Sequence, residues 1–178
     1  DKIRDWKEGI TKTLTGGLAR LAKQRKVEVV QGLGQFTGAN SLDVVSETGT
    51  QKITFENAII AAGSQVNKIP VFPNDDPRLM DSTDALNMQD VPKKLLIVGG
   101  GIIGLEMATV YHALGSEISV VELMDQIIPG CDKDLVTPLQ RHIKKQYKNI
   151  WLKTKVESIV PQDDGLKVTF GGDKAPEP

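Results

Sequence analysis

The chain lacks several features that would point to particular classes of protein. One cysteine among 178 residues excludes an internal disulfide and favours a reducing compartment. No apolar run approaches the roughly 20 residues that span a bilayer, and residues 1–8 are too charged for a secretory signal. A net charge of −1 gives no electrostatic reason to expect a nucleic-acid or membrane partner. We therefore expect a cytoplasmic protein.

Groups that could perform chemistry are also scarce. No set of Cys, His, Asp and Glu has the spacing of a metal site, so we expect no metal. Cys131 has no partner cysteine and follows a Pro-Gly turn. His112 lies within a predicted helix and His142 on a lysine-rich helix face, where histidines are usually solvated. We therefore expect no catalytic residue in this stretch.

The first third of the chain predicts a helix followed by short strands. Residues 1–24 repeat apolar side chains at helical spacing, and Gly16-Gly17 inside that stretch predicts a close approach or a break. The apolar positions are Trp6, Ile10, Leu14, Leu18 and Leu21. An antiparallel meander is predicted next, with strands at 27–30, around Phe36, at 42–45 and at 52–55.

Residues 58–63 and 64–92 have different patterns. The run 58–63 has no polar alternation, which predicts a fully buried strand of a parallel sheet. Residues 64–92 carry four of the nine prolines and predict a linker, with a short capped helical turn at 81–86. The four are Pro70, Pro73, Pro77 and Pro92.

The most informative stretch follows that linker. An apolar run at 95–98 leads into Gly99-Gly100-Gly101-Ile102-Ile103-Gly104, then a helix, a second apolar run and Glu122. This is the context in which GxGxxG binds a dinucleotide. Gly99 allows the tight turn, Gly101 lets the backbone approach the pyrophosphate, and Gly104 lets the helix pack on the strand. The helix N-terminus then faces the phosphates. The alternative is a glycine turn that serves packing alone.

Glu122 indicates which dinucleotide would bind. It stands about 20 residues after the turn, where a carboxylate accepts hydrogen bonds from the adenosine ribose hydroxyls. A 2′-phosphate would be repelled there, and no Arg follows nearby, so NAD is favoured over NADP. The alternative is a strand-end glutamate that is merely solvated.

Further elements complete an α/β, Rossmann-like pattern. A helix at 102–114 is closed by Gly115, and a strand at 117–122 follows. A helix near 132–147 has Asp132 as its cap. Its expected buried stripe is Leu135, Val136, Leu139 and Ile143. A third strand is predicted at 150–159 and a hairpin return at 165–170.

Across nearly its whole length the sequence resembles the flavin-dependent pyridine-nucleotide disulfide oxidoreductases. The resemblance rests on the strings LTGGLARLAKQRKVEVVQGLGQFTG, NAIIAAGS, DSTDAL and GGGIIGLEMATVYHALGS. Within the family it is greatest to the branch that oxidises dihydrolipoamide with NAD. Members that use NADPH carry Arg where Glu122 stands, and the glutathione-reducing members carry Tyr where Ile102 stands.

The resemblance implies a domain organisation and further site residues. Residues 1–63 would be the C-terminal part of an FAD-binding domain, 64–92 the linker, and 93–178 the N-terminal part of an NAD-binding domain. Gly34 would contact the FAD adenine, and Ala62, Gly63 and Ser64 would lie near the flavin nucleotide. Ala62 replaces the usual Thr, so a hydroxyl contact is lost. Glu106 would lie beside the nicotinamide and Val156 beside the NAD adenine.

It also implies what such an enzyme would need beyond this chain. The family reduces a disulfide through a cysteine pair and a His–Glu pair, and neither is present here. We therefore expect an internal fragment, inactive alone and retaining FAD only doubtfully. Its parent would be a homodimer that oxidises dihydrolipoamide and meets the lipoyl domains of a 2-oxo-acid dehydrogenase complex. The alternatives are a stand-alone NAD-binding module without turnover and an interaction protein that has lost its function.

Overall fold

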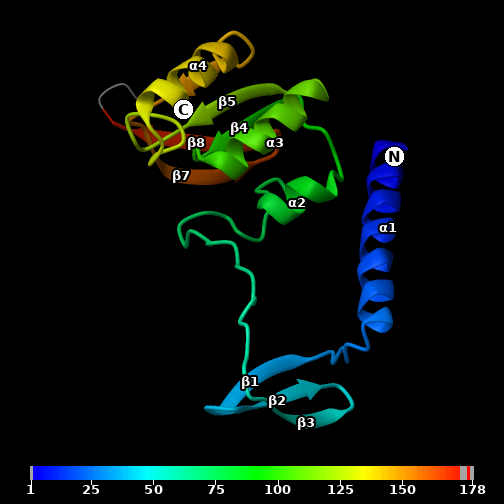
Figure 1. The fold of residues 1–178 in the computed structure, drawn as a ribbon. Coiled ribbons are helices and arrows are strands. Elements are labelled where there is room, and N and C mark those ends of the chain that lie inside the picture. Colours follow the sequence, from blue (N-terminus) through cyan, green and yellow to red (C-terminus); the bar gives the residue numbers. More distant parts are fainter. Residues whose placement is uncertain (1, 173–175, 177–178) are drawn as a thin grey trace. The chain divides into compact units, whose positions relative to one another are not determined.

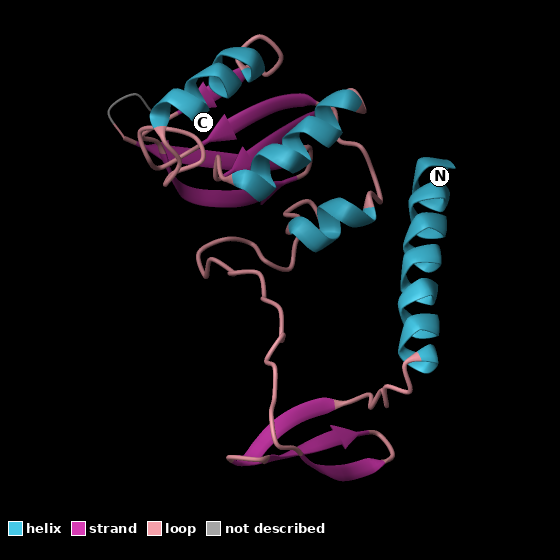
Figure 2. Ribbon diagram, in the orientation of Figure 1, coloured by secondary structure: helices cyan, strands magenta, loops and turns pink. Residues whose placement is uncertain are grey.

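The computed structural model describes residues 2–172 and residue 176, and the chain divides into two compact units between Ser64 and Gln65 (Figure 1). The first unit contains one helix and a three-stranded sheet. The second contains three helices, a parallel sheet and a hairpin (Figure 2). The mixture of helices with a parallel sheet confirms the predicted α/β class.

Helix α1 spans Lys2–Gln24 as predicted, but none of its residues is buried. Trp6 and Leu18 are 69% and 67% exposed, so the apolar stripe faces no core. The prediction of a break or close approach at Gly16-Gly17 is wrong for the described residues. The helix continues through both glycines, and a Cβ on either one would meet no atom within 4 Å.

The predicted meander is confirmed in three of its four strands. Strands β1 (Leu33–Gly38), β2 (Ser41–Ser46) and β3 (Gly49–Thr54) pair antiparallel in that order. Leu42 lies opposite Phe36 on one side and Ile53 on the other. The strand predicted at 27–30 is wrong, because that stretch is irregular and pairs with no strand among the described residues.

The buried strand predicted at 58–63 is also wrong. The stretch is irregular, and Ile59 and Ile60 are 95% and 75% exposed. A strand needs a neighbour to satisfy its N–H and C=O groups. No strand within the described part of the chain pairs with this one. The run is apolar as its sequence indicates, but burial depends on a partner.

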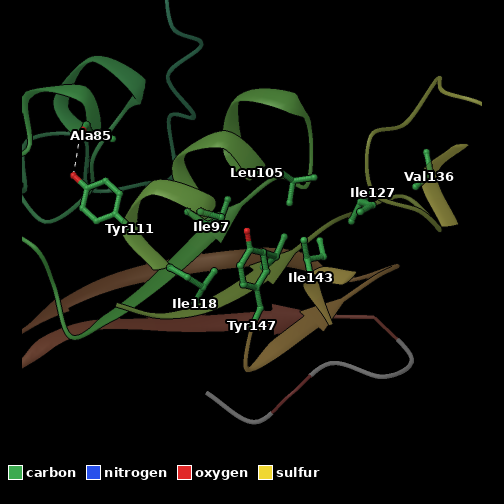
Figure 3. Packing of buried hydrophobic residues seen from close by; sticks show 11 residues of the cluster. Ala85, Ile97, Leu105, Tyr111, Ile118, Ile127, Val136, Ile143 and Tyr147 are labelled. Atoms are coloured by element: carbon green, nitrogen blue, oxygen red, sulfur yellow. Dashed lines mark hydrogen bonds between the residues drawn. The ribbon is translucent and has the colours of Figure 1, made fainter. Parts of the chain in front are cut away.

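In the second unit, β4 (Lys94–Val98), β5 (Glu117–Val121) and β6 (Asn149–Trp151) form a parallel sheet in that order. Helix α3 (Ile102–Ala113) connects the first pair of strands, and α4 (Lys133–Ile143) lies between the second pair in the chain. Ile118 and Tyr111 are fully buried between these layers (Figure 3), and Val120 is also fully buried. Parallel strands joined through helices are the unit from which Rossmann folds are built.

Several predicted details of this unit need correction. The strand expected at 150–159 is two strands, β6 and β7 (Lys155–Gln162), because the backbone turns at Lys153, where φ is +54°. The hairpin return is confirmed as β8 (Gly165–Gly171), antiparallel to β7. Of the four positions in the expected buried stripe of α4, Val136 and Ile143 are buried, whereas Leu135 and Leu139 are 71% and 37% exposed. Asp132 occupies the N-cap position of α4 without a side-chain cap hydrogen bond.

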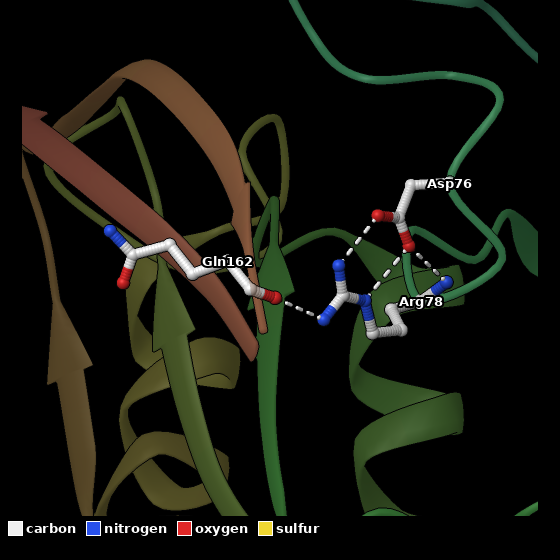
Figure 4. Close-up of polar contacts among 3 residues, drawn as sticks. All are labelled: Asp76, Arg78 and Gln162. Carbon is white, nitrogen blue, oxygen red and sulfur yellow. Dashed lines mark hydrogen bonds and ion pairs between the residues drawn. The ribbon is translucent and has the colours of Figure 1, made fainter. Parts of the chain in front are cut away.

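Hydrogen bonds tie the proline-containing segment to the rest of the second unit at several places, among them the Pro92 carbonyl, which accepts from the Ser116 hydroxyl at 2.6 Å. Asp81 caps α2 (Ser82–Asn87) through a capping box, as predicted, and the Tyr111 hydroxyl donates to the Ala85 carbonyl at 2.9 Å (Figure 3). Arg78 forms a bidentate pair with Asp76 and donates to the Gln162 carbonyl at 2.7 Å (Figure 4). The chain from Asp76 onward therefore has anchored points within this unit.

Candidate dinucleotide-binding site

The three glycines of the GxGxxG turn have the geometry that the sequence predicts. Gly99 has a φ of +101°, a conformation that favours glycine, and its N–H donates to the Val121 carbonyl at 2.8 Å. A Cβ on Gly104 would collide with the Gly99 carbonyl oxygen and lie 2.9 Å from Ile97 Cγ2. A Cβ on Gly101 would meet no atom within 4 Å, so the backbone here is open to an approaching group.

The turn leads directly into the N-terminus of α3. Gly101 is the N-cap residue and makes no side-chain cap hydrogen bond. Leu105 N–H is bonded to the Gly101 carbonyl at 3.0 Å, whereas the N–H groups earlier in the helix have no intrahelical acceptor. Ile102 and Ile103 are about 60% exposed, at 62% and 61%. This helix end can therefore present N–H donors and a partial positive charge to an anion.

Glu122 follows β5 and is held firmly in the fold. Only 7% of it is exposed, and its carboxylate accepts N–H bonds from Gly100 and Met124, each at 2.8 Å. Its own N–H donates to the Trp151 carbonyl, and its carbonyl accepts from Thr154. The alternative of a merely solvated glutamate does not describe this side chain. An ionised carboxylate has about four acceptor positions, so two backbone bonds leave capacity for ribose hydroxyls.

Two residues that the sequence analysis missed complete this arrangement. Ile128 N–H donates to the Gly100 carbonyl at 2.8 Å, and Lys153 N–H donates to the Met124 carbonyl at 2.9 Å. Both have left-handed backbones, with φ of +48° and +54°. Ile and Lys carry no sequence signal for this conformation, which is most common for Gly, Asn and Asp. Ile127, fully buried, packs under Gly100.

The remaining predicted site residues lie elsewhere in their units. Glu106 is exposed on α3, one turn from its start, and Val156 is half-buried in β7 opposite Phe170. The residues expected to contact FAD belong to the first unit. Gly34 lies in β1 opposite Val44, and residues 62–64 are exposed and irregular, with Gly63 at a φ of +72°.

Little else in the described residues suggests chemistry. No group of His, Cys, Asp and Glu there could hold a metal ion, and no helix there is long and apolar enough to cross a membrane. Cys131 and His142 are exposed. His112 is half-buried and packs edge-on against the Tyr147 ring at 5.7 Å, so it is not the solvated histidine we expected. Burial raises the pKa of the Tyr111 hydroxyl, and the charge of Asp90 adds to that increase.

The fold and the glycine turn belong to a known class. Residues 2–175 match the family model of the pyridine nucleotide-disulphide oxidoreductases, and the chain belongs to this family. Its Rossmann-like FAD/NAD-binding fold accounts for the parallel sheet and the turn into α3.

Among curated proteins, the chain is similar to dihydrolipoyl dehydrogenases. It is 55% identical to that of Vibrio cholerae over 176 residues, which are 99% of this chain and 37% of the relative. It is 51% identical to that of Haemophilus influenzae, covering 97% of this chain and 36% of the relative. The chain thus spans little more than a third of the length of these relatives, and its one cysteine excludes a redox disulfide within it.

Solved structures give the same class. The HOCl-induced flavoprotein disulfide reductase RclA from Escherichia coli matches with a TM-score of 0.81 and 26% identity, covering 98% of this chain and 39% of that one. LpdA from Mycobacterium tuberculosis matches with a TM-score of 0.80 at 18% identity, covering 95% of this chain and 38% of that one, and shows the fold alone.

Proposed function

We propose that the second unit carries the NAD site of a dihydrolipoamide:NAD oxidoreductase. The observation that supports this most strongly is the buried Glu122 carboxylate, which two backbone N–H groups orient beside the glycine turn. Gly99 to Gly104, with Ile102 and Ile103 at the helix start, would hold the pyrophosphate, and Glu122 would bind the adenosine ribose. The bound nicotinamide would accept the hydride.

The residues present fit such a cofactor. The space where a Cβ of Gly101 would lie is open to a pyrophosphate, and the first N–H groups of α3 have no acceptor within the helix. Glu106, exposed one helical turn further on, would act at the nicotinamide end, and Val156 would border the adenine. These residues bind and orient, and none of them is assigned a proton transfer.

The other parts of the proposal rest on similarity to the longer relatives. Residues 1–63 would belong to an FAD-binding domain in which Gly34 and residues 62–64 approach the flavin nucleotide. The working enzyme would be a cytoplasmic homodimer that takes electrons from lipoyl domains of a 2-oxo-acid dehydrogenase complex. This chain on its own would be inactive with dihydrolipoamide, because it contains one cysteine where the reaction needs a pair.

The cofactor preference provides a direct test. NADH and NADPH are titrated against the chain and against Glu122→Gln, with quenching of protein fluorescence as the readout. We expect the chain to prefer NADH by about 1–3 kcal/mol, since the carboxylate repels a 2′-phosphate. In Glu122→Gln both affinities fall, because the amide leaves one backbone donor unsatisfied, and the ratio between them approaches one.

Glu117→Gln is the matched control. It makes the same chemical change at the other end of β5, where the carboxylate is exposed and pairs with Lys148 at 2.8 Å. It should keep the NADH preference of the unchanged chain. Equal affinities for NADH and NADPH in the unchanged chain would reject the assignment of Glu122. A preparation of this chain that is yellow from bound flavin and active with dihydrolipoamide would contradict the expected inactivity. NADH binding without flavin absorbance or turnover would be the behaviour of a module that only binds the dinucleotide.

A further inference from the structure

The two residues that orient Glu122 are each held through both their N–H and their carbonyl group. Gly100 donates its N–H to one carboxylate oxygen of Glu122, and its carbonyl accepts the N–H of Ile128. Met124 donates its N–H to the other carboxylate oxygen, and its carbonyl accepts the N–H of Lys153. All four bonds are 2.8–2.9 Å long. The carboxylate and the glycine turn are thus joined in one hydrogen-bonded frame.

Both outer donors are residues in an unfavourable backbone conformation. The described chain has four non-glycine residues with positive φ, and two of them, Ile128 and Lys153, donate into this frame. For a β-branched residue such as Ile128 the left-handed conformation is a genuine outlier. Such strain persists only where the surrounding structure imposes it, and it concentrates at functional sites.

We propose that Ile128 is a positioning residue of the dinucleotide site: its left-handed backbone directs its N–H to Gly100 and so presets the glycine turn for the pyrophosphate. The proposal rests on the function proposed above. The conformation of the glycine turn then depends on more than its glycines, because Ile128, in the loop after Glu122, donates a hydrogen bond to it. Ile128 has no contact assigned to the cofactor and acts through Gly100.

The chain offers a close control. Met88 is also an apolar residue with a left-handed backbone, at a φ of +49°, and it is also partly buried against the core cluster. Its N–H donates to Ala85 at the end of α2 rather than to the glycine turn. Ile128→Gly and Met88→Gly each remove a partly buried apolar side chain from a left-handed position, and the N–H acceptors differ, being the Gly100 carbonyl for residue 128 and the Ala85 carbonyl for residue 88.

The first measurement is amide hydrogen exchange by NMR on the chain without nucleotide. The Gly100 N–H donates to Glu122, so its exchange reports how firmly the glycine turn is held. Glycine at position 128 can adopt many conformations besides the left-handed one, so the bond from residue 128 to the Gly100 carbonyl should form for less of the time. The turn is then loosened, and exchange at Gly100 should be about fivefold faster in Ile128→Gly, the equivalent of one backbone hydrogen bond. Met88→Gly should leave exchange at Gly100 unchanged. Ile128→Asn should exchange more slowly at Gly100 than Ile128→Gly, because Asn adopts the left-handed region and has fewer alternative backbone conformations than glycine. No change in Ile128→Gly, or an equal change in Met88→Gly, would overturn the proposal.

The second measurement is the affinity for NADH and NADPH. Ile128→Gly should weaken both by the same factor, about fivefold, and keep their ratio, because the turn is loosened while Glu122 keeps its charge. Loss of the ratio in Ile128→Gly would contradict a role confined to the turn. If the unchanged chain binds no NADH, the proposed function fails, and exchange at Gly100 still decides whether Ile128 holds the turn.

Discussion

Two short apolar runs of this molecule differ in structure and in burial. Residues 58–62 in the first unit read Ala-Ile-Ile-Ala-Ala and lie exposed without secondary structure. Residues 95–98 in the second unit read Leu-Leu-Ile-Val and form most of β4. Val98 pairs with Val121 of β5, and Ile97 packs in the core under α3.

The difference lies in the neighbours. Strand β4 has a parallel partner that exchanges hydrogen bonds with it and a helix that covers its apolar side chains. The run at 58–62 has neither within the described residues. Helix α1 is likewise apolar on one face and unburied: it forms as a helix, and none of its residues is buried. Local sequence specifies the apolar character of a segment, and the elements around it decide whether it is buried.

The largest expected effect compares one isoleucine from each run. Ile97→Ala should destabilise the second unit by about 2–5 kcal/mol, since it removes buried side-chain volume from the core. Ile59→Ala, at a residue that is 95% exposed, should change stability by less than about 0.5 kcal/mol. Urea unfolding followed by Trp151 fluorescence in a Trp6→Phe background measures the second unit, and far-UV circular dichroism in the same titration also reports the first unit. Equal costs for the two substitutions would show that the run at 58–62 is packed in solution.

A smaller effect is expected from one alanine in each unit. Gly104→Ala should destabilise by about 1–3 kcal/mol, because its Cβ would collide with the Gly99 carbonyl and Ile97. Gly17→Ala should raise the helicity of α1 by removing a glycine cost of about 1 kcal/mol, since its Cβ meets nothing. Far-UV circular dichroism and urea midpoints report both. A stable Gly104→Ala variant would contradict the tight crossing of helix and strand.

The smallest effect is expected in residues 73–80, a stretch that is irregular like 57–64 but is anchored through Arg78. The side-chain hydrogen bonds from Arg78 to Asp76 lower the pKa of that carboxyl from 3.8 to about 2. A lowered pKa in the folded chain stabilises it above pH 4, and this contribution declines as the pH falls toward 2. Asp76→Asn should therefore lower the urea midpoint slightly at pH 6, and its difference from the unchanged chain should narrow below pH 4.

Asp75→Asn is the matched control for that substitution. It makes the same change one position earlier, away from the bidentate pair with Arg78. Its difference from the unchanged chain should vary less between pH 6 and pH 3. A constant difference for Asp76→Asn over that range would mean that the Arg78 pair does not contribute to folding.

Sequence reasoning predicted those elements whose signals are local. The glycine turn, the helix after it and the acidic residue after β5 all stand where their spacing indicated, because each carries a turn or periodicity signal. The strand at 58–63 and the stripe position Leu135 were wrong because burial depends on other segments. The hydrogen bonds from Ile128 and Lys153 could not be predicted, since their backbone conformations are imposed by the fold against the preference of the residue. The domain assignments and the cofactor contacts remain predictions.

If Glu122 sets the cofactor preference as proposed, the bonds to its carboxylate also limit how that preference could change during evolution or by design. An arginine at this position would attract a 2′-phosphate. Because arginine has no acceptor, it would leave the N–H groups of Gly100 and Met124, which now donate to the Glu122 carboxylate, without an acceptor. Under that proposal, a change of preference from NAD to NADP weakens the glycine turn unless a second substitution first supplies a new acceptor. The order in which such substitutions accumulate is constrained, and a single exchange at Glu122 is a poor starting point for redesign.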